Sequence, residues 1–322
     1  MDAIYQFGIS LIHSLQTLSP ALDGLMQGTT FLGRIEFYLV FIPFIYWSID
    51  RRVGVRALLL LVYTDFVAYS FKQLLHQPRP YWISDVKAMG VEPSYGIPSS
   101  HASNTLSVGG YLATKIKKNW FWAFLIILLL LIGISRLYLG LHFPQDVLFG
   151  WLVGFAVLWA VAKWESKVRD WLDGKSLSVQ IGLGFLDSLF IVLIGFIVRF
   201  ILKGMPDPAS YSSYTADART ITHFFTLSGA AFGTYLGYAL MRQFARFNTK
   251  GTWGKRVLRY IVGIAGLLLV YYGLSQVFDL FAADESALGY FLRYIRYSFV
   301  TLWAIFLAPW VFLKTKLAES ED

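Results

Sequence analysis

Six charged or titratable side chains stand out in this chain because they fall into three short blocks at defined spacings. The blocks are Lys72 to Arg79-Pro80, Pro98-Ser99-Ser100-His101, and Ser135-Arg136 followed by His142 and Asp146. The rest of the sequence is strongly apolar, and a charge inside or beside a bilayer is costly unless it has a function. Three cations, two imidazoles and one carboxylate are the groups that phosphate transfer needs.

The cationic side chains predict a phosphate-binding site. Lys72, Arg79 and Arg136 carry enough positive charge to neutralise a phosphate dianion, so neither a metal ion nor another cofactor is expected. Arg suits paired contacts to phosphate oxygens, and Lys suits a single contact. Ser99 and Ser100 open a predicted helix, where the Ser99 hydroxyl and free backbone N–H groups would point at the same anion.

The two histidines are predicted to have complementary catalytic roles. His142 lies just before Pro144, which suits the first turn of a helix, and Asp146 can then reach back to one imidazole nitrogen. This contact leaves the other nitrogen free to attack phosphorus. His101 is the remaining titratable group. We expect it to protonate the departing oxygen and then to activate the water that hydrolyses the phosphohistidine.

The alternation of apolar runs with charged loops predicts an all-α, multi-pass membrane protein. Of the 322 residues, 56% are hydrophobic and 15% are charged, whereas a soluble domain has roughly a quarter charged residues. Apolar runs long enough to cross a bilayer recur along the whole chain. An amphipathic stretch at 4–16 is followed by about nine expected spans, near 33–49, 57–74, 100–114, 120–140, 145–162, 178–200, 221–241, 257–277 and 288–313.

The basic loops predict the orientation, because Lys and Arg in short loops favour the cytoplasmic side. Most of the 28 basic residues lie in alternate loops, at 51–56, 115–118, 163–175, 242–259 and 314–316. The N-terminus is then outside and the C-terminus inside. All three blocks meet at the extracytoplasmic face, which is periplasmic in a bacterial inner membrane and lumenal in the endoplasmic reticulum of a eukaryote.

The motifs divide the chain into two parts. Residues 1–165 carry every block and form the expected membrane-embedded core, and residues 166–322 form a C-terminal four-helix extension of unknown role. The chain has no Cys, so disulfide and thiolate chemistry are excluded. The N-terminus lacks the basic region of a cleaved signal peptide. No nucleic-acid motif is present, and the expected partners are the bilayer and a phosphorylated substrate.

Together the three blocks resemble the type 2 phosphatidic acid phosphatase superfamily, whose pattern is Lys-x6-Arg-Pro, Pro-Ser-Gly-His and Ser-Arg-x5-His-x3-Asp. The resemblance covers about residues 57–160 and implies a metal-independent phosphatase with a phosphohistidine intermediate at His142. It also implies His101 as the acid and Asp146 as the orienting group. The implied phosphate ligands are Lys72, Arg79, Ser99 and Arg136.

Two features beside the blocks have open interpretations. Ser100 stands where the family usually has Gly; Ser is tolerated at a helix start but not at a position with positive φ, and we expect a helix start. Tyr81, Trp82 and Tyr95 form a possible headgroup pocket, although aromatic side chains also anchor helices at the membrane interface.

The substrate class has several candidates. A site at the membrane–water boundary is open to laterally diffusing lipids. The leading candidate substrates are therefore phosphatidic acid, phosphatidylglycerol phosphate and polyprenyl diphosphates. The expected architecture, with Arg79-Pro80-Tyr81-Trp82, is also similar to glucose-6-phosphatase in the same superfamily, which would imply a sugar phosphate. A phosphotransferase would use the same site. A transporter is a weaker alternative, because no inverted repeat is apparent. The oligomeric state stays open.

Overall fold

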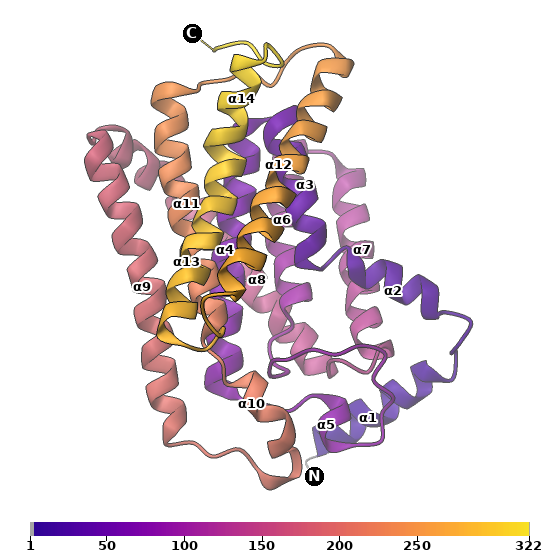
Figure 1. The fold of residues 1–322 in the computed structure, drawn as a ribbon. Coiled ribbons are helices and arrows are strands. Elements are labelled where there is room, and N and C mark those ends of the chain that lie inside the picture. The colour runs from indigo at the N-terminus through magenta and orange to yellow at the C-terminus, as the bar shows by residue number, and fades with distance from the viewer. Residues whose placement is uncertain (1–2, 322) are drawn as a thin grey trace. The chain divides into compact units, whose positions relative to one another are not determined.

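The structure, a computed structural model, describes residues 3–321, and this part of the chain is helical (Figure 1). Within it no strand forms, and Phe247 and Ser320 make an isolated antiparallel bridge. The predicted all-α class is confirmed.

The N-terminal half of the chain contains eight helices among its described residues. These are α1 (Ala3–Gln16), α2 (Asp23–Phe31), α3 (Ile35–Ser48), α4 (Arg51–Leu75), α5 (Pro80–Ile83), α6 (Ser100–Ile116), α7 (Asn119–Tyr138) and α8 (Pro144–Asp173). The C-terminal half continues with α9 (Leu177–Lys203), η1 (Ala209–Tyr214), α10 (Thr215–Ala218), α11 (Thr222–Phe244), α12 (Trp253–Asp279), α13 (Ala287–Leu302), η2 (Trp303–Leu307) and α14 (Ala308–Lys314).

The predicted count of about nine membrane spans is not confirmed. Six helical stretches of the described chain are long and apolar enough to cross a membrane, or seven if the bent pair α2 and α3 forms one span. The six stretches are Arg51–Ile83, Asn119–Tyr138, Pro144–Asp173, Leu177–Lys203, Trp253–Asp279 and Ala287–Lys314. The expected spans at 100–114 and 221–241 are helical, but α6 and α11 carry many polar and small residues. These two helices lack the length or the apolar character of the six stretches, and both bury much of their surface against protein.

The described chain divides into two compact units, each built from separate segments. One unit combines the N-terminal stretch up to Tyr38 with Tyr63–Val161 and Phe196–Thr220. The other combines Leu39–Val62, Ala162–Gly195 and the chain from Ile221 onward. Several long helices therefore contribute to both units. The sequence boundary expected near residue 165 stays a prediction.

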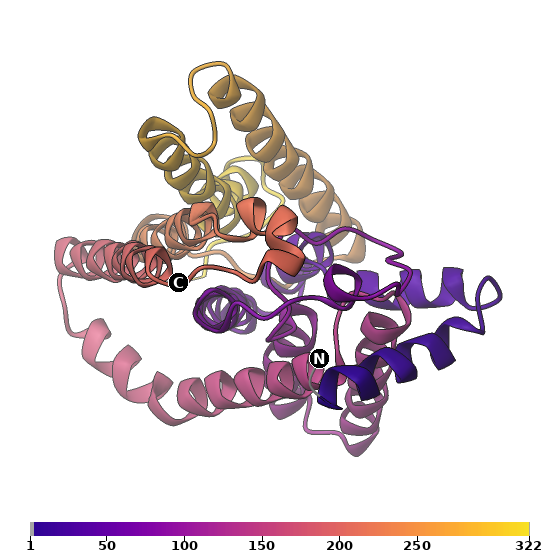
Figure 2. The same cartoon turned by 90° about the horizontal axis from the view of Figure 1, so that it is seen from below.

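In the first unit, helix ends meet where the three blocks lie. α6 and α7 pair as a hairpin, and α1 and α2 pack against α7. The start of α6 and the end of α7 lie on the same side as α5 in Figure 1. Seen from below in Figure 2, η1 lies beside α5, and the two are in contact. A buried cluster joins α1, α6, α7, α8 and two loops, and consists of Ile12, Val86, Ala102, Leu137, Phe143 and Val147. This cluster holds the N-terminal ends of α6 and α8 together.

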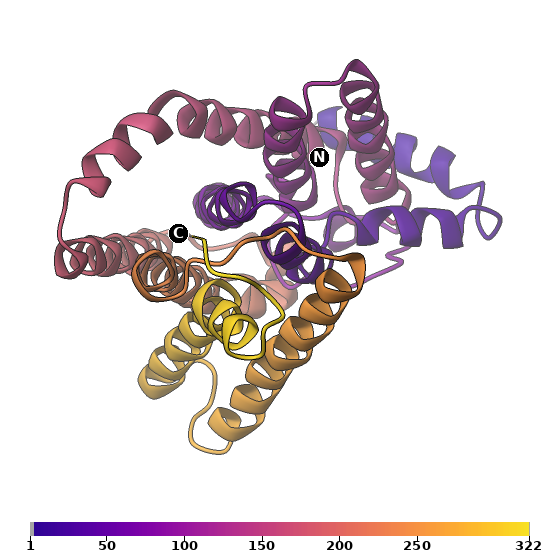
Figure 3. The same cartoon turned by 90° about the horizontal axis from the view of Figure 1, so that it is seen from above.

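In the second unit, α11, α12 and α13 lie side by side, as Figure 3 shows from above. α11 and α13 approach closely, since a Cβ atom at Gly233 would lie 2.1 Å from the carbonyl oxygen of Ser298. The π-turn η2 supplies acceptors to α3: the Tyr46 hydroxyl donates to Ile305 O and the Trp47 indole to Ala304 O, both at 2.8 Å. This unit is stabilised by close helix packing at small residues and by buried hydrogen bonds.

Candidate active site

The three predicted phosphate-binding cations lie at helix ends and are buried. Lys72 is in the last turn of α4, Arg79 directly precedes α5, and Arg136 is in the last turn of α7. Their exposed fractions are 3%, 0% and 0%. Buried cations need carbonyl or anionic partners, because an unpaired buried charge is costly. The three side chains therefore require a polar centre, and the loop before α6 provides it.

Backbone carbonyls of this loop satisfy two of the cations. Lys72 Nζ donates to Tyr95 O at 2.9 Å and to Gly96 O at 3.1 Å. Arg79 Nε donates to Ser94 O at 2.5 Å, and Arg79 Nη2 donates to the Ser94 hydroxyl at 3.0 Å. One short segment thus contacts both side chains, although they lie seven residues apart on different elements.

Glu92, in the same loop, is the anionic partner that the sequence analysis missed. Its carboxylate accepts from Arg136 Nη2 at 2.5 Å and lies 3.9 Å from Arg79 Nη2. Although burial raises the pKa of Glu92, Arg136 and Arg79 outweigh burial and hold it well below the usual carboxyl range. The sequence held one indication of this residue, because Glu92 is the only Glu between the first two blocks.

His142 and Asp146 make the contact that their spacing predicted. α8 begins at Pro144, and Asp146 Oδ2 lies 3.1 Å from His142 Nδ1, with exposed fractions of 1% and 2%. His142 Nε2 lies 3.2 Å from Arg79 Nη1. Because a guanidinium can only donate, Nε2 must present its lone pair and Nδ1 must carry the proton. The unprotonated nitrogen therefore faces Arg79, one of the three predicted phosphate ligands.

The protonation state of His142 follows from the same surroundings. Burial lowers the pKa of His142 well below its usual range, and the positive charges of Arg79 and Lys72 lower it further. The imidazole is consequently neutral at physiological pH, as a nucleophile must be.

His101 lies beside the third cation. Its Nε2 is 3.4 Å from Arg136 Nη1, and the same Arg136 nitrogen donates to Thr30 Oγ1 at 2.9 Å. Thr30 comes from α2, which no sequence pattern linked to the site. His101 thus lies beside Arg136 and His142 beside Arg79, two members of the cation group formed by Lys72, Arg79 and Arg136.

The serine block begins a helix, as expected. Ser99 is the N-cap of α6, and its hydroxyl accepts from Ala102 N at 3.5 Å. The Ser99 backbone N–H donates to Asp146 O at 2.9 Å. α6 starts at Ser100, which is not among the described residues with positive φ. Ser at the usual Gly position is therefore accommodated without backbone strain.

Gly96 packs so closely that a methyl group would disturb the site. A Cβ atom there would lie 2.7 Å from Pro78 O and 3.1 Å from Asp146 Oδ2. Gly96→Ala should lower the melting temperature and reduce kcat/KM by at least about tenfold, because overpacking costs about 1–3 kcal/mol. Gly90→Ala is the control, since its Cβ would meet only Leu141 side-chain atoms at 3.4 Å or more. Equal melting temperatures and activities for the two variants would contradict the prediction.

A second polar network holds this loop from the other side. The Tyr95 hydroxyl donates to Asp207 at 3.0 Å, and Arg219 Nε donates to Asp207 at 2.6 Å. Burial and Asp207 raise the pKa of Tyr95 above its usual range. Tyr95 was predicted to line a headgroup pocket; its side chain is buried and directed to Asp207, while its carbonyl oxygen serves Lys72.

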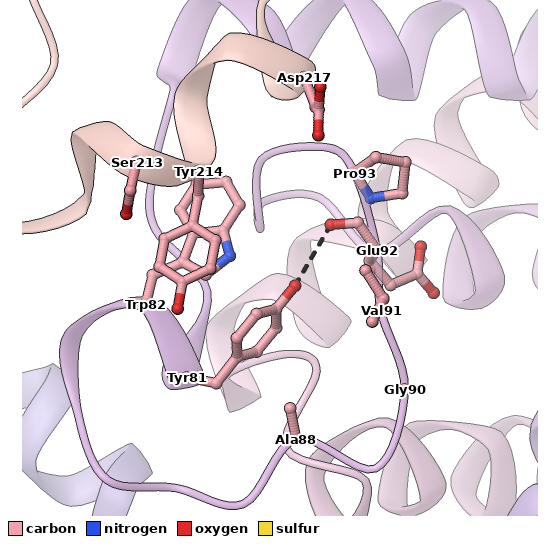
Figure 4. A pocket seen from close by; sticks show the side chains of 10 residues that line it. All are labelled: Tyr81, Trp82, Ala88, Gly90, Val91, Glu92, Pro93, Ser213, Tyr214 and Asp217. Carbon is pink, nitrogen blue, oxygen red and sulfur yellow. Dashed lines mark hydrogen bonds between the residues drawn. The ribbon is translucent and has the colours of Figure 1, made fainter.

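Tyr81 and Trp82, the other two predicted pocket residues, line a cavity of about 390 Å³. Figure 4 shows Tyr81, Trp82 and Tyr214 on one side of this pocket, with Glu92 and Asp217 on the other. The Trp82 and Tyr214 rings are stacked, with centroids 5.3 Å apart. Because Glu92 also contacts Arg136, the pocket adjoins the cation group.

Two profiles of one superfamily match this chain. The PAP2 superfamily profile matches residues 54–170, which include all three blocks, and the profile for the PAP2 superfamily phosphatase transmembrane extension matches residues 225–320. The chain belongs to the PAP2 superfamily. The resemblance inferred from the three blocks is thereby confirmed, and the C-terminal helices are an extension that other PAP2 proteins share.

Relatives with curated names include phosphatases of lipids and of sugars. Lipid phosphate phosphatase delta of Arabidopsis thaliana is 27% identical over 52% of this PAP2 chain and 44% of its own length. Sphingosine-1-phosphate phosphatase 2 of Mus musculus is 28% identical over 64% of the chain and 55% of its own length. The chain thus spans about half the length of these two relatives. Mouse glucose-6-phosphatase 3 is 22% identical over 97% of the chain and 96% of its own length.

Proposed function

We propose that this PAP2 protein is a membrane phosphatase that hydrolyses a lipid phosphate monoester or diphosphate through a phosphohistidine at His142. The observation that carries the proposal is the orientation of His142. Its Nδ1 is held by Asp146 at 3.1 Å, and its Nε2 lone pair faces Arg79 at 3.2 Å. This arrangement aims a neutral nucleophile at the place where a cation group would bind phosphate.

In the proposed first step, His142 Nε2 attacks phosphorus and the bond from phosphorus to the leaving oxygen breaks. Lys72, Arg79 and Arg136 stabilise the charge on the equatorial oxygens, with the N-terminus of α6 at Ser99. His101 donates a proton to the leaving oxygen. A bound phosphate dianion beside His101 favours its protonated form, because an opposite charge stabilises the imidazolium.

In the second step, water attacks phosphorus and the phosphorus–nitrogen bond to His142 breaks. His101, now neutral, accepts the proton of the attacking water. Inorganic phosphate leaves, and both histidines return to their starting states. A hydroxyl group in place of water would give a phosphotransferase with the same residues.

The proposed substrate is a lipid because the blocks lie at helix ends, and the basic loops favour an extracytoplasmic position for those ends. There, at the bilayer boundary, a lipid phosphate could reach the site laterally. Two of the relatives are named as phosphatases of lipid substrates, which supports this class. The membrane would be a bacterial inner membrane, with the site toward the periplasm, or the endoplasmic reticulum in a eukaryote.

A sugar phosphate is the second candidate, and the pocket beside the cation group favours it. Stacked aromatic rings and two carboxylates, Glu92 and Asp217, suit a polyhydroxylated leaving group, because carboxylates accept from hydroxyls and rings pack on apolar sugar faces. The relation to glucose-6-phosphatase 3 over nearly the whole chain also supports this candidate.

Phosphate release by the full chain in detergent, with EDTA present, tests both candidates. The substrates are phosphatidic acid, phosphatidylglycerol phosphate, undecaprenyl diphosphate and glucose 6-phosphate. We expect release that survives EDTA and is fastest with a lipid phosphate. Fastest release from glucose 6-phosphate would select the sugar candidate. Release that EDTA abolishes would contradict the metal-independent mechanism.

A further inference from the structure

Glu92 contacts two of the cations to which the proposed function assigns the substrate phosphate. Its carboxylate lies between two guanidinium groups, 2.5 Å from Arg136 Nη2 and 3.9 Å from Arg79 Nη2. Both Arg side chains are completely buried, whereas the Glu92 side chain is 26% exposed. The carboxylate thus contacts, from the more accessible side, two of the three cations assigned to the substrate phosphate.

The remaining donors of Arg136 show why a phosphate and Glu92 compete. Nη1 donates to Thr30 and lies near His101, and Nη2 donates to Glu92. Nε is buried without a hydrogen-bond partner in the described part of the chain. A phosphate that binds this guanidinium through two oxygens needs Nη2 and one further nitrogen. Two anions on these donors at contact distance repel each other, so Glu92 and a phosphate weaken one another's binding.

The backbone around Glu92 is held while its side chain has room to move. The Tyr81 hydroxyl donates to Glu92 O at 3.3 Å, and Pro93 restricts the next backbone φ. Glu92 is one of the residues that line the pocket of about 390 Å³, and Figure 4 shows its carboxylate pointing away from Tyr81, Trp82 and Tyr214. A rotation of the side chain, which is 26% exposed, would carry the carboxylate from Arg136 toward this pocket while the loop backbone stays in place.

We propose that Glu92 is an internal competitor for the phosphate-binding arginines, which a substrate phosphate displaces into the adjoining pocket. This inference rests on the proposed function, since it assumes that Arg79 and Arg136 bind phosphate. Glu92 would weaken the binding of both substrate and product phosphate and so favour product release.

Binding of ³²P-labelled inorganic phosphate to the full chain in detergent tests this role. Glu92→Gln keeps the size of the side chain and removes its charge. We expect the dissociation constant for phosphate to fall about tenfold, equivalent to about 1.4 kcal/mol. Glu165→Gln is the matched control, because Glu165 pairs with Arg56 at 2.5 Å and its side chain is 25% exposed. This variant should bind phosphate like the wild type.

A second variant keeps the test decisive if Glu92→Gln fails to fold. Glu92→Asp keeps the charge but is one methylene shorter, so it reaches Arg136 less well and should also bind phosphate more tightly than the wild type. Unchanged or weaker phosphate binding in the folded variants would overturn the role of Glu92. If the variants bind phosphate in this order but the protein hydrolyses none of the four substrates named above, the role of Glu92 is supported and the proposed phosphatase activity is rejected. No phosphate binding by any of the proteins would reject both proposals.

Discussion

Replacing His142 by Ala should reduce phosphate release by about 10³-fold or more, because the proposed nucleophile is removed. Rapid acid-free quenching with ³²P-labelled substrate should trap a phosphoenzyme in the wild type that is stable to base and labile to acid, as a phosphorus–nitrogen bond is. The variant should show none. Asp146→Asn should retain the intermediate but form it about 10²–10⁴-fold more slowly, because the tautomer of His142 is no longer fixed.

The control for this experiment is a second His–Asp pair in the same chain. His13 Nε2 lies 3.2 Å from Asp85 Oδ1, nearly the separation of the His142–Asp146 pair, but its side chain is 44% exposed. His13→Ala should therefore leave the rate and the phosphoenzyme unchanged. A base-stable phosphoenzyme that persists in His142→Ala would show that another residue is the nucleophile.

Replacing His101 by Gln should slow turnover of a lipid phosphate by about 10²–10⁴-fold, the usual loss when a general acid is removed. The reaction of p-nitrophenyl phosphate should respond differently, because its leaving group departs without protonation. The first step should then remain fast while hydrolysis of the phosphohistidine becomes slow. Stopped-flow absorbance should show a burst of one p-nitrophenolate per active site, followed by a slow phase.

Phosphoenzyme should accumulate during that slow phase, and its amount should match the burst. The burst separates a role in proton transfer from a role in holding Arg136, which lies 3.4 Å from His101. If His101 only positioned Arg136, both steps would slow together and neither burst nor phosphoenzyme would appear. His13→Gln serves as the control and should behave as the wild type.

The local part of the site was predictable because it depends on contacts within one helical turn. The spacing of His142 and Asp146, with Pro144 between them, predicts a reach-back contact at the start of a helix, and the structure contains it. The start of α6 at Ser100 follows in the same way from N-cap chemistry. Such contacts need no knowledge of the rest of the fold.

The parts that sequence analysis missed come from segments that meet only in three dimensions. Thr30 reaches Arg136 from α2, and Asp207 reaches Tyr95 from the chain before η1. The pocket needed Tyr214 as well as Tyr81 and Trp82. These residues lie in loops or short helices without periodicity, so no spacing rule connects them. Glu92 belongs to the same group, because its importance depends on two arginines that converge on it.

The sequence by itself determined the apolar, helical character of this chain, the three PAP2 blocks, and the cations, histidines and carboxylate that these blocks contain. Only the tertiary structure decided which helices bury polar and small residues against protein, as α6 and α11 do. It also decided that a loop carboxylate pairs with Arg136 and Arg79, two of the predicted phosphate ligands. The physical reason is that side-chain chemistry is local, whereas burial and the pairing of charges depend on segments that are distant in the chain.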